Sequence, residues 1–293
     1  MIGTALIREL ISRGVRTLVL CHEGSPRNHV IPDHELVTKI YTSLGRFGEL
    51  ENTSGEAYDV FYHFAWEGTT GPGRNDMYLQ NRNVKNALDA VHMAHRFGCH
   101  TFVGAGSQAE YGRVEGVLRP DTPAFPEMGY GIAKLCAGQM TREVAHQLGM
   151  KHIWSRILSV YGPCDGPNSM VMSTIHKLHD KEIPKTTKGE QLWDYLYSGD
   201  AAKALYLMGC NGRDGKVYVL GSGHVKPLLE YILEIREIVD PDGKLGIGEI
   251  PYAEKQVMYL CADITDINQD LGWVPETDFK DGIRKILREE YQK

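Results

Sequence analysis

The chain has 293 residues, of which 42% are hydrophobic and 24% charged, with a formal net charge of −6 at pH 7. These values are ordinary for a globular protein with a substantial core, and the negative charge argues against a general nucleic-acid binder. No apolar run approaches membrane-spanning length, and Arg8 and Glu9 interrupt the first one as they would not in a signal peptide, so we expect a cytoplasmic protein with no membrane partner.

Helical and strand patterns alternate from the first residues onward. The opening MIGTALIREL places apolar residues at helical spacing before Gly14, which predicts a helix. Short apolar runs at 16–21 and 37–42 predict strands, and DVFYHFAW at 59–66 predicts a strand buried on both faces. A long amphipathic helix is expected from near Asn83 to Gly98.

The alternation continues through the middle of the chain. Strands are predicted at 101–106 and 152–158, on either side of a helix from about Tyr130 to Gly149. This order predicts right-handed βαβ units, hence an α/β fold with a doubly wound parallel sheet of the Rossmann type.

A change of amino-acid composition after Tyr161 indicates a domain boundary. The following loop is rich in Gly, Pro, Asn and Ser, so we expect a dinucleotide-binding domain at 1–164 and a smaller mixed α/β substrate domain at 165–293. Residues of about 195–225 are expected to return to the first domain, because KVYVLGSG has the pattern of a buried strand.

Cysteine and histidine spacing indicates neither disulfides nor metal. The six cysteines form no Cys-x-x-Cys pair, so we expect free thiols in a reducing compartment. His176 and His179 have the spacing of helical metal ligands, but no organised carboxylate or third histidine accompanies them, so no metal site is expected.

Three residues carry the strongest chemical signal. Tyr130 and Lys134 form a Tyr-x-x-x-Lys pair on one helical face, and Ser107 follows a strand at the edge where parallel sheets hold ligands. A lysine ammonium lowers the pKa of a nearby tyrosine, which then exchanges a proton with a substrate hydroxyl, while a serine steadies the developing charge. Such a pair also arises by chance on a solvated helix; the preceding serine favours catalysis.

These motifs resemble the extended short-chain dehydrogenase/reductases, specifically the NAD-dependent epimerase/dehydratase branch that modifies nucleotide sugars. The matching segments are DVFYHFAW, GAGSQAEYG, YGIAK, RILSVYGP, WDYLYSGDAAKAL, VYVLGSG and DLGWVP. The resemblance implies that Ser107, Tyr130 and Lys134 are catalytic. Cofactor contacts are expected, besides Tyr130 and Lys134, at Gly3, Cys21, His22, Arg27, Leu44, Phe64, Ala65, Trp66, Asn83 and Leu158. Substrate contacts are expected at Ser107, Gln108, Ser159 and Trp193.

Departures from the family pattern narrow the expected reaction. Gln108 and Ala109 stand where the dehydratases have an Asp-Glu pair, which favours a nucleotide-sugar 4-epimerase or 4-ketoreductase over a 4,6-dehydratase. Trp193 replaces an arginine that meets the diphosphate in many relatives, and Ser159 replaces an asparagine. Either the diphosphate contact is lost or nearby lysines supply it. These lysines are equally well explained as residues of a solvated surface; they are Lys177, Lys181, Lys185 and Lys188. The alternative is a cofactor-binding sensor or regulatory module without turnover.

The expected cofactor is NADP or NAD. An acidic residue at the end of the second strand would favour NAD, but the chain has Cys21 and His22 there, with Glu23 one or two positions late. His22 and Arg27 suit a 2′-phosphate, which favours NADP slightly.

Gly3 resembles the last glycine of a Gly-x-x-Gly-x-x-Gly cofactor loop. The strand and two glycines that would precede it, roughly ten residues, are not in the sequence, so we expect Met1 to be an internal methionine of a truncated chain or of one with a misplaced start. A gap flanked by unpaired backbone groups is then expected within the sheet. The resemblance also implies a homodimer through the helices of Asn83 and Tyr130.

Overall fold

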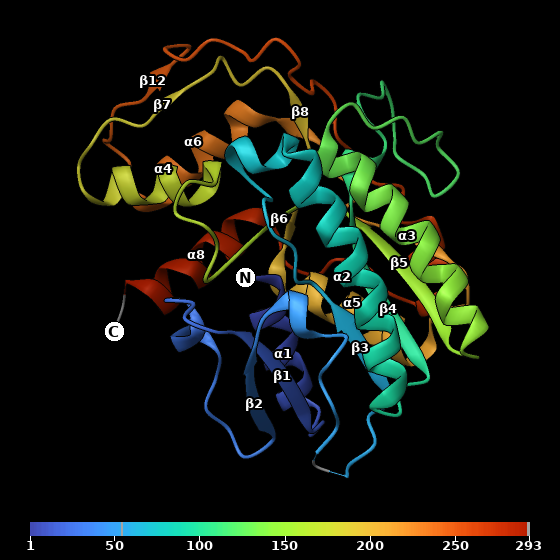
Figure 1. Ribbon diagram of the computed structural model, residues 1–293. Helices are drawn as coiled ribbons and strands as arrows, with labels where there is room; N and C mark the ends of the chain where they lie inside the picture. The colour runs from blue at the N-terminus through green and yellow to red at the C-terminus, as the bar shows by residue number, and fades with distance from the viewer. Residues whose placement is uncertain (54, 292–293) are drawn as a thin grey trace.

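The computed structural model describes residues 1–53 and 55–291, and its centre is a parallel sheet with helices on both faces (Figure 1). Four strands pair in the order β10-β5-β4-β3: β3 (Val60–His63), β4 (Thr101–Ser107), β5 (Lys151–Ile157) and β10 (Val217–Leu220). A separate parallel pair is formed by β1 (Thr17–His22) and β2 (Val37–Thr42). The α/β class and the parallel sheet that the sequence predicts are confirmed.

The expected gap lies between β1 and β3. Among the described residues these two strands share no ladder, and a cavity of about 850 Å³ is lined by both of them. The sheet is therefore divided between β1 and β3.

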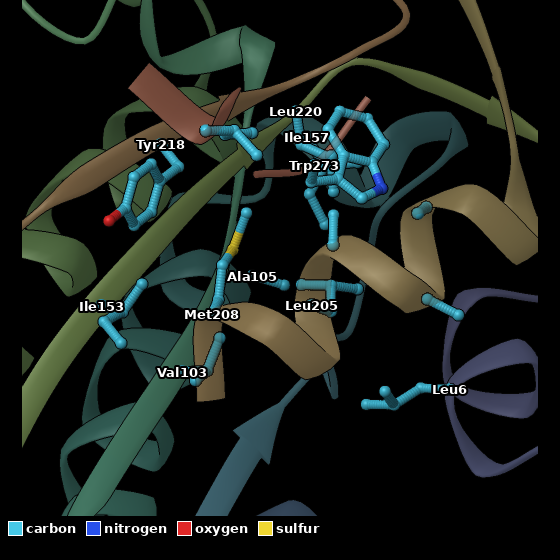
Figure 2. Close-up of a cluster of buried hydrophobic side chains, with 14 of the residues drawn as sticks. Leu6, Val103, Ala105, Ile153, Ile157, Leu205, Met208, Tyr218, Leu220 and Trp273 are labelled. Carbon is cyan, nitrogen blue, oxygen red and sulfur yellow. The ribbon is translucent and has the colours of Figure 1, made fainter. Parts of the chain in front are cut away.

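Two pairs of helices cover the sheet. One face carries α1 (Ile2–Ser12) and α5 (Ser198–Asn211), and the other carries α2 (Met77–Arg96) and α3 (Gly129–Gln147). Figure 2 shows the cluster beneath the first pair, to which Leu6 of α1, Met208 of α5 and Val103 of β4 belong, with Met208 next to Val103. Burial of these apolar surfaces is the main stabilising term for the layers.

The C-terminal part packs around a second, aromatic cluster that includes Tyr161, Tyr231 and Phe279. Its helices are α4 (Met170–His179), α6 (Leu228–Val239) and α8 (Phe279–Glu290), whereas α7 (Thr265–Leu271) packs into the first cluster through Ile267. Its short strands are β6 (Ser159–Tyr161), β7 (Lys185–Thr186), β8 (Leu192–Trp193), β9 (Tyr195–Tyr197), β11 (Lys226–Pro227) and β12 (Gly246–Ile247). The domain boundary near 164 stays a prediction, and β10 is part of the main sheet.

Two element boundaries differ from the sequence expectation. β3 ends at His63, three residues before the apolar run ends, because the chain turns away to a loop whose Glu67 backbone is bonded by the Asn83 side chain. The long helix begins at Met77 rather than near Asn83, since the Asp76 carboxylate accepts from the first amides of that helix. Such a cap contributes about 1 kcal/mol.

Four 3₁₀ turns complete the described chain: η1 (Asn28–Val30), η2 (Leu44–Arg46), η3 (Gly71–Asn75) and η4 (Gln108–Glu110). Within residues 1–53 and 55–291, no helix has both the length and the apolarity required to span a bilayer. In the same residues, no group of histidine, cysteine and acidic side chains is arranged to hold a metal ion, and the six cysteines are free thiols.

Candidate functional site

Ser107, Tyr130 and Lys134 converge at the carboxyl edge of the sheet. Ser107 ends β4 and caps η4, where its Oγ accepts a hydrogen bond of 3.2 Å from the Ala109 amide. Tyr130 and Lys134 lie in the first turns of α3, and a side-chain hydrogen bond joins Tyr130 to Ser107. The chain thus brings a phenol, a hydroxyl and an amine from two elements to one place.

Gly131 allows α3 to approach this serine turn. A Cβ atom at position 131 would lie 2.2 Å from the Ala109 carbonyl oxygen, far inside van der Waals contact. The helix start is also anchored, because the Gly129 amide donates to Asn75 Oδ1 at 3.0 Å. A side chain at position 131 would therefore push Tyr130 away from Ser107.

Lys134 is buried, with 3% of its surface exposed. Its Nζ donates to the Ala105 carbonyl at 2.7 Å and lies 3.9 Å from the centre of the Trp66 ring. Burial lowers the pKa of Lys134 to about 7, while the charge of Glu110 opposes that shift. A desolvated cation–π contact contributes about 2 kcal/mol and holds the amine inside the site.

The pKa of Tyr130 is raised, not lowered, from its ordinary value. Burial is the largest cause, and the Ser107 hydrogen bond and the nearby Arg74 charge act in the opposite direction. The expectation that Lys134 lowers this pKa is wrong for this structure, since the amine points to Ala105 and lies 5.9 Å from the centre of the tyrosine ring. Tyr130 is therefore a protonated phenol at neutral pH.

Glu110 and Arg74 were not predicted as parts of the site. The fully buried Glu110 carboxylate accepts from the Ser107 amide at 2.7 Å and from Arg156 Nε at 2.8 Å, and so fixes the serine turn. Its sequence signal is the Ser-x-x-Glu capping box of 107–110. The Arg74 guanidinium stacks 4.5 Å from the centre of the Tyr130 ring, and nothing in the sequence pattern indicates this contact.

The amino end of α1 opens into the cavity between β1 and β3. Met1 caps this helix without a side-chain bond, and a Cβ at Gly3 would meet only Phe64, at 3.9 Å. Arg27, Phe64 and Ala65 line the same cavity. Free amides and the positive helix end suit a pyrophosphate, so this end of the cavity fits a dinucleotide cofactor.

Three expected cofactor residues are packed in the core. Cys21, Leu44 and Leu158 expose 3%, 7% and 7% of their surfaces. Burial raises the pKa of the Cys21 thiol, and its Sγ is directed to the Val19 carbonyl. None of the three is among the described residues that line the cavity.

Of the remaining expected cofactor residues, Arg27 lines the cavity, whereas His22, Trp66 and Asn83 are not among the described residues that line it. His22 is exposed at the end of β1, and the Arg27 guanidinium donates to the Cys164 carbonyl. The buried Asn83 amide is bonded to the Glu67 backbone at 2.9 and 3.0 Å. Asn83 therefore holds the loop that carries Trp66, and its own polar atoms are occupied.

The expected substrate residues meet in pairs. Gln108 follows Ser107 on η4, half-buried. Trp193 Nε1 donates to Ser159 Oγ at 2.9 Å, which joins β8 to β6. These two expected substrate residues thus bond to each other.

The lysines considered for the diphosphate lie on the C-terminal part. Lys181 pairs with Asp240 at 3.1 Å and Lys185 with Glu249 at 3.2 Å, so the charges of both are partly neutralised. Lys177 is half-buried on α4 and Lys188 is exposed in the loop after β7. Their role toward a diphosphate stays a prediction.

Comparisons with known proteins show the family and the fold of this chain. A model of the NAD dependent epimerase/dehydratase family matches residues 1–221. Among curated proteins, the dTDP-glucose 4,6-dehydratase of Shigella flexneri is 28% identical over 178 residues, which are 58% of this chain and 49% of that protein. The chain thus spans about half the length of the curated relatives it matches.

Solved structures share the fold over nearly the whole chain. The UDP-glucose 4-epimerase of Thermotoga maritima with UDP-glucose superposes with a TM-score of 0.86 at 20% identity, covering 100% of this chain and 96% of that one. The protein RMD of Pseudomonas aeruginosa, complexed with NADPH, superposes with a TM-score of 0.79 at 18% identity, covering 92% and 97%. At these identities the likeness concerns the fold alone.

Proposed function

Because the chain belongs to the NAD dependent epimerase/dehydratase family, we propose that it is a nucleotide-sugar 4-epimerase or 4-ketoreductase that uses a nicotinamide cofactor. The observation that carries this proposal is the convergence of Ser107, Tyr130 and Lys134 at the carboxyl edge of the sheet. Solved relatives that bind UDP-glucose or NADPH support the same class of substrate and cofactor.

Tyr130, Ser107 and Lys134 have different roles in the reaction at the sugar C4 oxygen. Tyr130, protonated at neutral pH, donates its proton to this oxygen when the sugar is reduced; to take a proton when the sugar is oxidised, it must first lose its own and act as the phenolate. Ser107 donates a hydrogen bond to the same oxygen. Lys134, with its pKa near 7, supplies or takes up a proton one helical turn away. A nicotinamide dinucleotide would be held at Gly3, Arg27 and Phe64 and would supply the hydride donor and acceptor.

The residues after Ser107 argue against dehydration. Gln108 and Ala109 lack the acid and base that elimination at the neighbouring carbons requires. Glu110 is the nearest carboxylate along the chain, but it is fully buried and bonded to Arg156 and Trp154. It therefore serves the serine turn and does not replace the missing pair.

A cofactor-binding module without turnover is the second candidate. The cavity between β1 and β3 favours this candidate, because the edge of the sheet that would hold the cofactor is interrupted there. Tight binding of NADH or NADPH together with an absence of turnover on every nucleotide sugar tested supports this candidate and contradicts the enzyme.

Replacement of Tyr130 by phenylalanine tests the proposed chemistry. We expect Tyr130→Phe to lower kcat by about 10²–10⁴-fold on whichever UDP, dTDP, GDP or CDP sugar the wild type converts. Tyr78→Phe, at an 84% exposed tyrosine on α2, is the matched control and should keep full activity. Net consumption of NAD(P)H by the wild type indicates a reductase, and turnover without it indicates an epimerase. Turnover of Tyr130→Phe at the wild-type rate would show that Tyr130 has no part in the mechanism.

Arg27 tests the choice of cofactor. We propose NADP, because Arg27 lines the cavity and its guanidinium can pair with a 2′-phosphate. Calorimetric titration should show tighter binding of NADPH than of NADH, and Arg27→Ala should weaken NADPH binding about tenfold or more while sparing NADH. Arg142→Ala, at a half-buried arginine on α3 that pairs with Glu143, is the control. Tighter binding of NADH by the wild type would contradict the NADP proposal.

A further inference from the structure

Glu110 is a buried carboxylate beneath the serine turn that the proposed acid–base steps do not use. Its oxygens accept from the Ser107 amide at 2.7 Å, from Trp154 Nε1 at 3.0 Å and from Arg156 Nε at 2.8 Å. The Arg156 guanidinium also lies 4.4 Å from the centre of the Tyr111 ring, and burial raises the pKa of that tyrosine. A buried ion pair is weak evidence of stabilisation, because apolar residues of similar volume commonly serve as well. A charge in this place therefore calls for a role other than stability.

Gly106 leaves the space in which this carboxylate reaches the strand. A Cβ atom at position 106 would lie 2.5 Å from Glu110 Oε1 and 2.3 Å from Trp154 Nε1. The carboxylate and the indole N–H therefore lie directly against the backbone of β4, one residue before Ser107. This close approach fixes the carboxylate relative to β4 and to the serine that ends it.

The Ser107 hydroxyl is oriented by the turn that Glu110 closes. The capping box is reciprocal, since Glu110 accepts from the Ser107 amide while Ser107 Oγ accepts from the Ala109 amide at 3.2 Å. Because the Ala109 amide occupies one lone pair of Oγ, the hydroxyl proton is left for Tyr130, to which Ser107 is hydrogen-bonded. Loss of the carboxylate would release this turn.

Lys134 binds the same strand two residues before Ser107. Its Nζ donates to the Ala105 carbonyl, so the amine and the Glu110 carboxylate flank one short segment of β4. Across residues 1–53 and 55–291, Lys134 forms no ion pair with a carboxylate, and the charge of Glu110 opposes the lowering of its pKa by burial. A buried ammonium without a nearby negative charge loses its proton more readily.

The other charged and titratable groups around the amine do not supply a negative charge. Tyr130 on α3 and His63 on β3 are uncharged at neutral pH. Arg74 on η3, 4.5 Å from the centre of the Tyr130 ring, and Arg156 on β5 are cations. In the part of the chain that the structure describes, Glu110 is therefore the anion of this neighbourhood.

We propose that Glu110 is a positioning residue of the site. It orients the Ser107 hydroxyl toward Tyr130, and it supplies the counter-charge of the buried Lys134 ammonium. Arg156 holds the carboxylate in place from β5. This inference deepens the proposed function and rests on it for the kinetic measurement alone, because the protonation of the amine can be measured without turnover.

Titration of Lys134 by NMR tests the counter-charge. In protein with isotope-labelled lysine, the signal of Lys134 is the one that Lys134→Met removes. We expect Glu110→Gln to lower the pKa of Lys134, about 7 in the wild type, by about one pH unit, because the amide accepts a hydrogen bond but carries no charge. Glu143→Gln, at an exposed glutamate on the same helix, is the matched control and should leave this pKa unchanged.

Two further variants separate the charge from the fold. Glu110→Asp keeps the charge on a shorter side chain and should leave the pKa of Lys134 close to its wild-type value. The double variant Glu110→Gln, Arg156→Met leaves no unpaired charge in the interior, so it should fold even where the single variant does not. It should show the same fall in the pKa of Lys134.

Kinetics test the effect on the reaction. On a nucleotide sugar that the wild type converts, Glu110→Gln should lower kcat by about 10–100-fold, and the pH limb of kcat that belongs to Lys134 should move to lower pH together with its pKa. A loss of kcat that is equal at every pH would reveal a merely structural role and overturn the proposal. An unchanged pKa of Lys134 in both neutral variants would overturn it as well, whereas a wild type without turnover would contradict the proposed function and leave the titration to decide.

Discussion

At the scale of single residues, His63 is a buried polar group in apolar surroundings. Its ring lies among Phe47, Phe61 and Phe102, and its Nε2 finds no hydrogen-bond partner in the part of the chain that the structure describes. Burial lowers the pKa of His63 from 6.5 to about 3, with a smaller contribution from the charge of Lys134. The histidine is therefore neutral in the folded protein at neutral and mildly acidic pH.

Replacement of His63 by phenylalanine should stabilise the fold, increasingly so in acid. Between about pH 3 and 6.5 the unfolded chain binds a proton at this position and the native chain does not, so wild-type stability falls as the pH falls through that window. We expect His63→Phe to gain about 1 kcal/mol at pH 7 and up to about 2 kcal/mol more at pH 5.

Urea unfolding at both pH values measures this gain. His92→Phe, at an exposed histidine on α2, is the matched control and should show no such dependence on pH. A gain for His63→Phe that is equal at pH 5 and pH 7 would contradict the assignment of a neutral buried imidazole.

At the scale of elements, Asp194 joins three segments that are distant in sequence. This fully buried residue, between β8 and β9, accepts from Ser222 and Gly223 after β10 and from the Ala262 amide before α7, at 2.7 to 3.0 Å. Burial raises the pKa of Asp194, and these hydrogen bonds oppose the shift. One side chain therefore holds the edge of the C-terminal part against the main sheet.

Asp194→Asn should destabilise the protein by about 2–4 kcal/mol. The new amide nitrogen is a donor, and it would face backbone donors that now point to a carboxylate oxygen. Chemical unfolding in urea measures the loss, with Asp121→Asn at an exposed aspartate as control. Equal midpoints for the two variants would show that the carboxylate is not the link between the segments.

At the scale of the whole molecule, we propose a homodimer through α2 and α3. Both helices expose large apolar side chains, among them Tyr78 at 84% and Met77 at 55% on α2, and Ile132 at 48% and Met140 at 43% on α3. Ile132 and Met140 lie two turns apart on one face of α3, so they extend one patch. Patches of this kind mark association surfaces.

Light scattering tests the dimer. The wild type should show twice the chain mass of 32.8 kDa, and the double variant Ile132→Glu, Met140→Glu should show the single mass. The control double variant Ile183→Glu, Ile250→Glu alters two equally exposed isoleucines elsewhere and should remain dimeric. A monomeric wild type would contradict the proposed dimer.

Local pattern by itself determined the order and type of the main elements. Helical spacing and apolar runs depend on neighbouring residues, so the parallel sheet, its helices and the expected gap between β1 and β3 follow from the sequence. Ser107, Tyr130 and Lys134 were also predictable, since a strand end and one helical face bring them together. The boundary error at His63 arose where the Asn83 side chain binds the loop after β3, and the error at Met77 arose from the adjacent Asp76 cap, a local signal that the sequence reading missed.

Only the tertiary structure decided the environment of these residues. The direction of the Tyr130 pKa shift and the pKa of Lys134 depend on burial by segments that are distant in sequence. No local sequence pattern contains that information. The same holds for Glu110 beneath the serine turn and for the contact between Trp193 and Ser159. The local sequence pattern determines which side chains reach the site. Tertiary packing determines how far each of them is desolvated, and desolvation sets its protonation state.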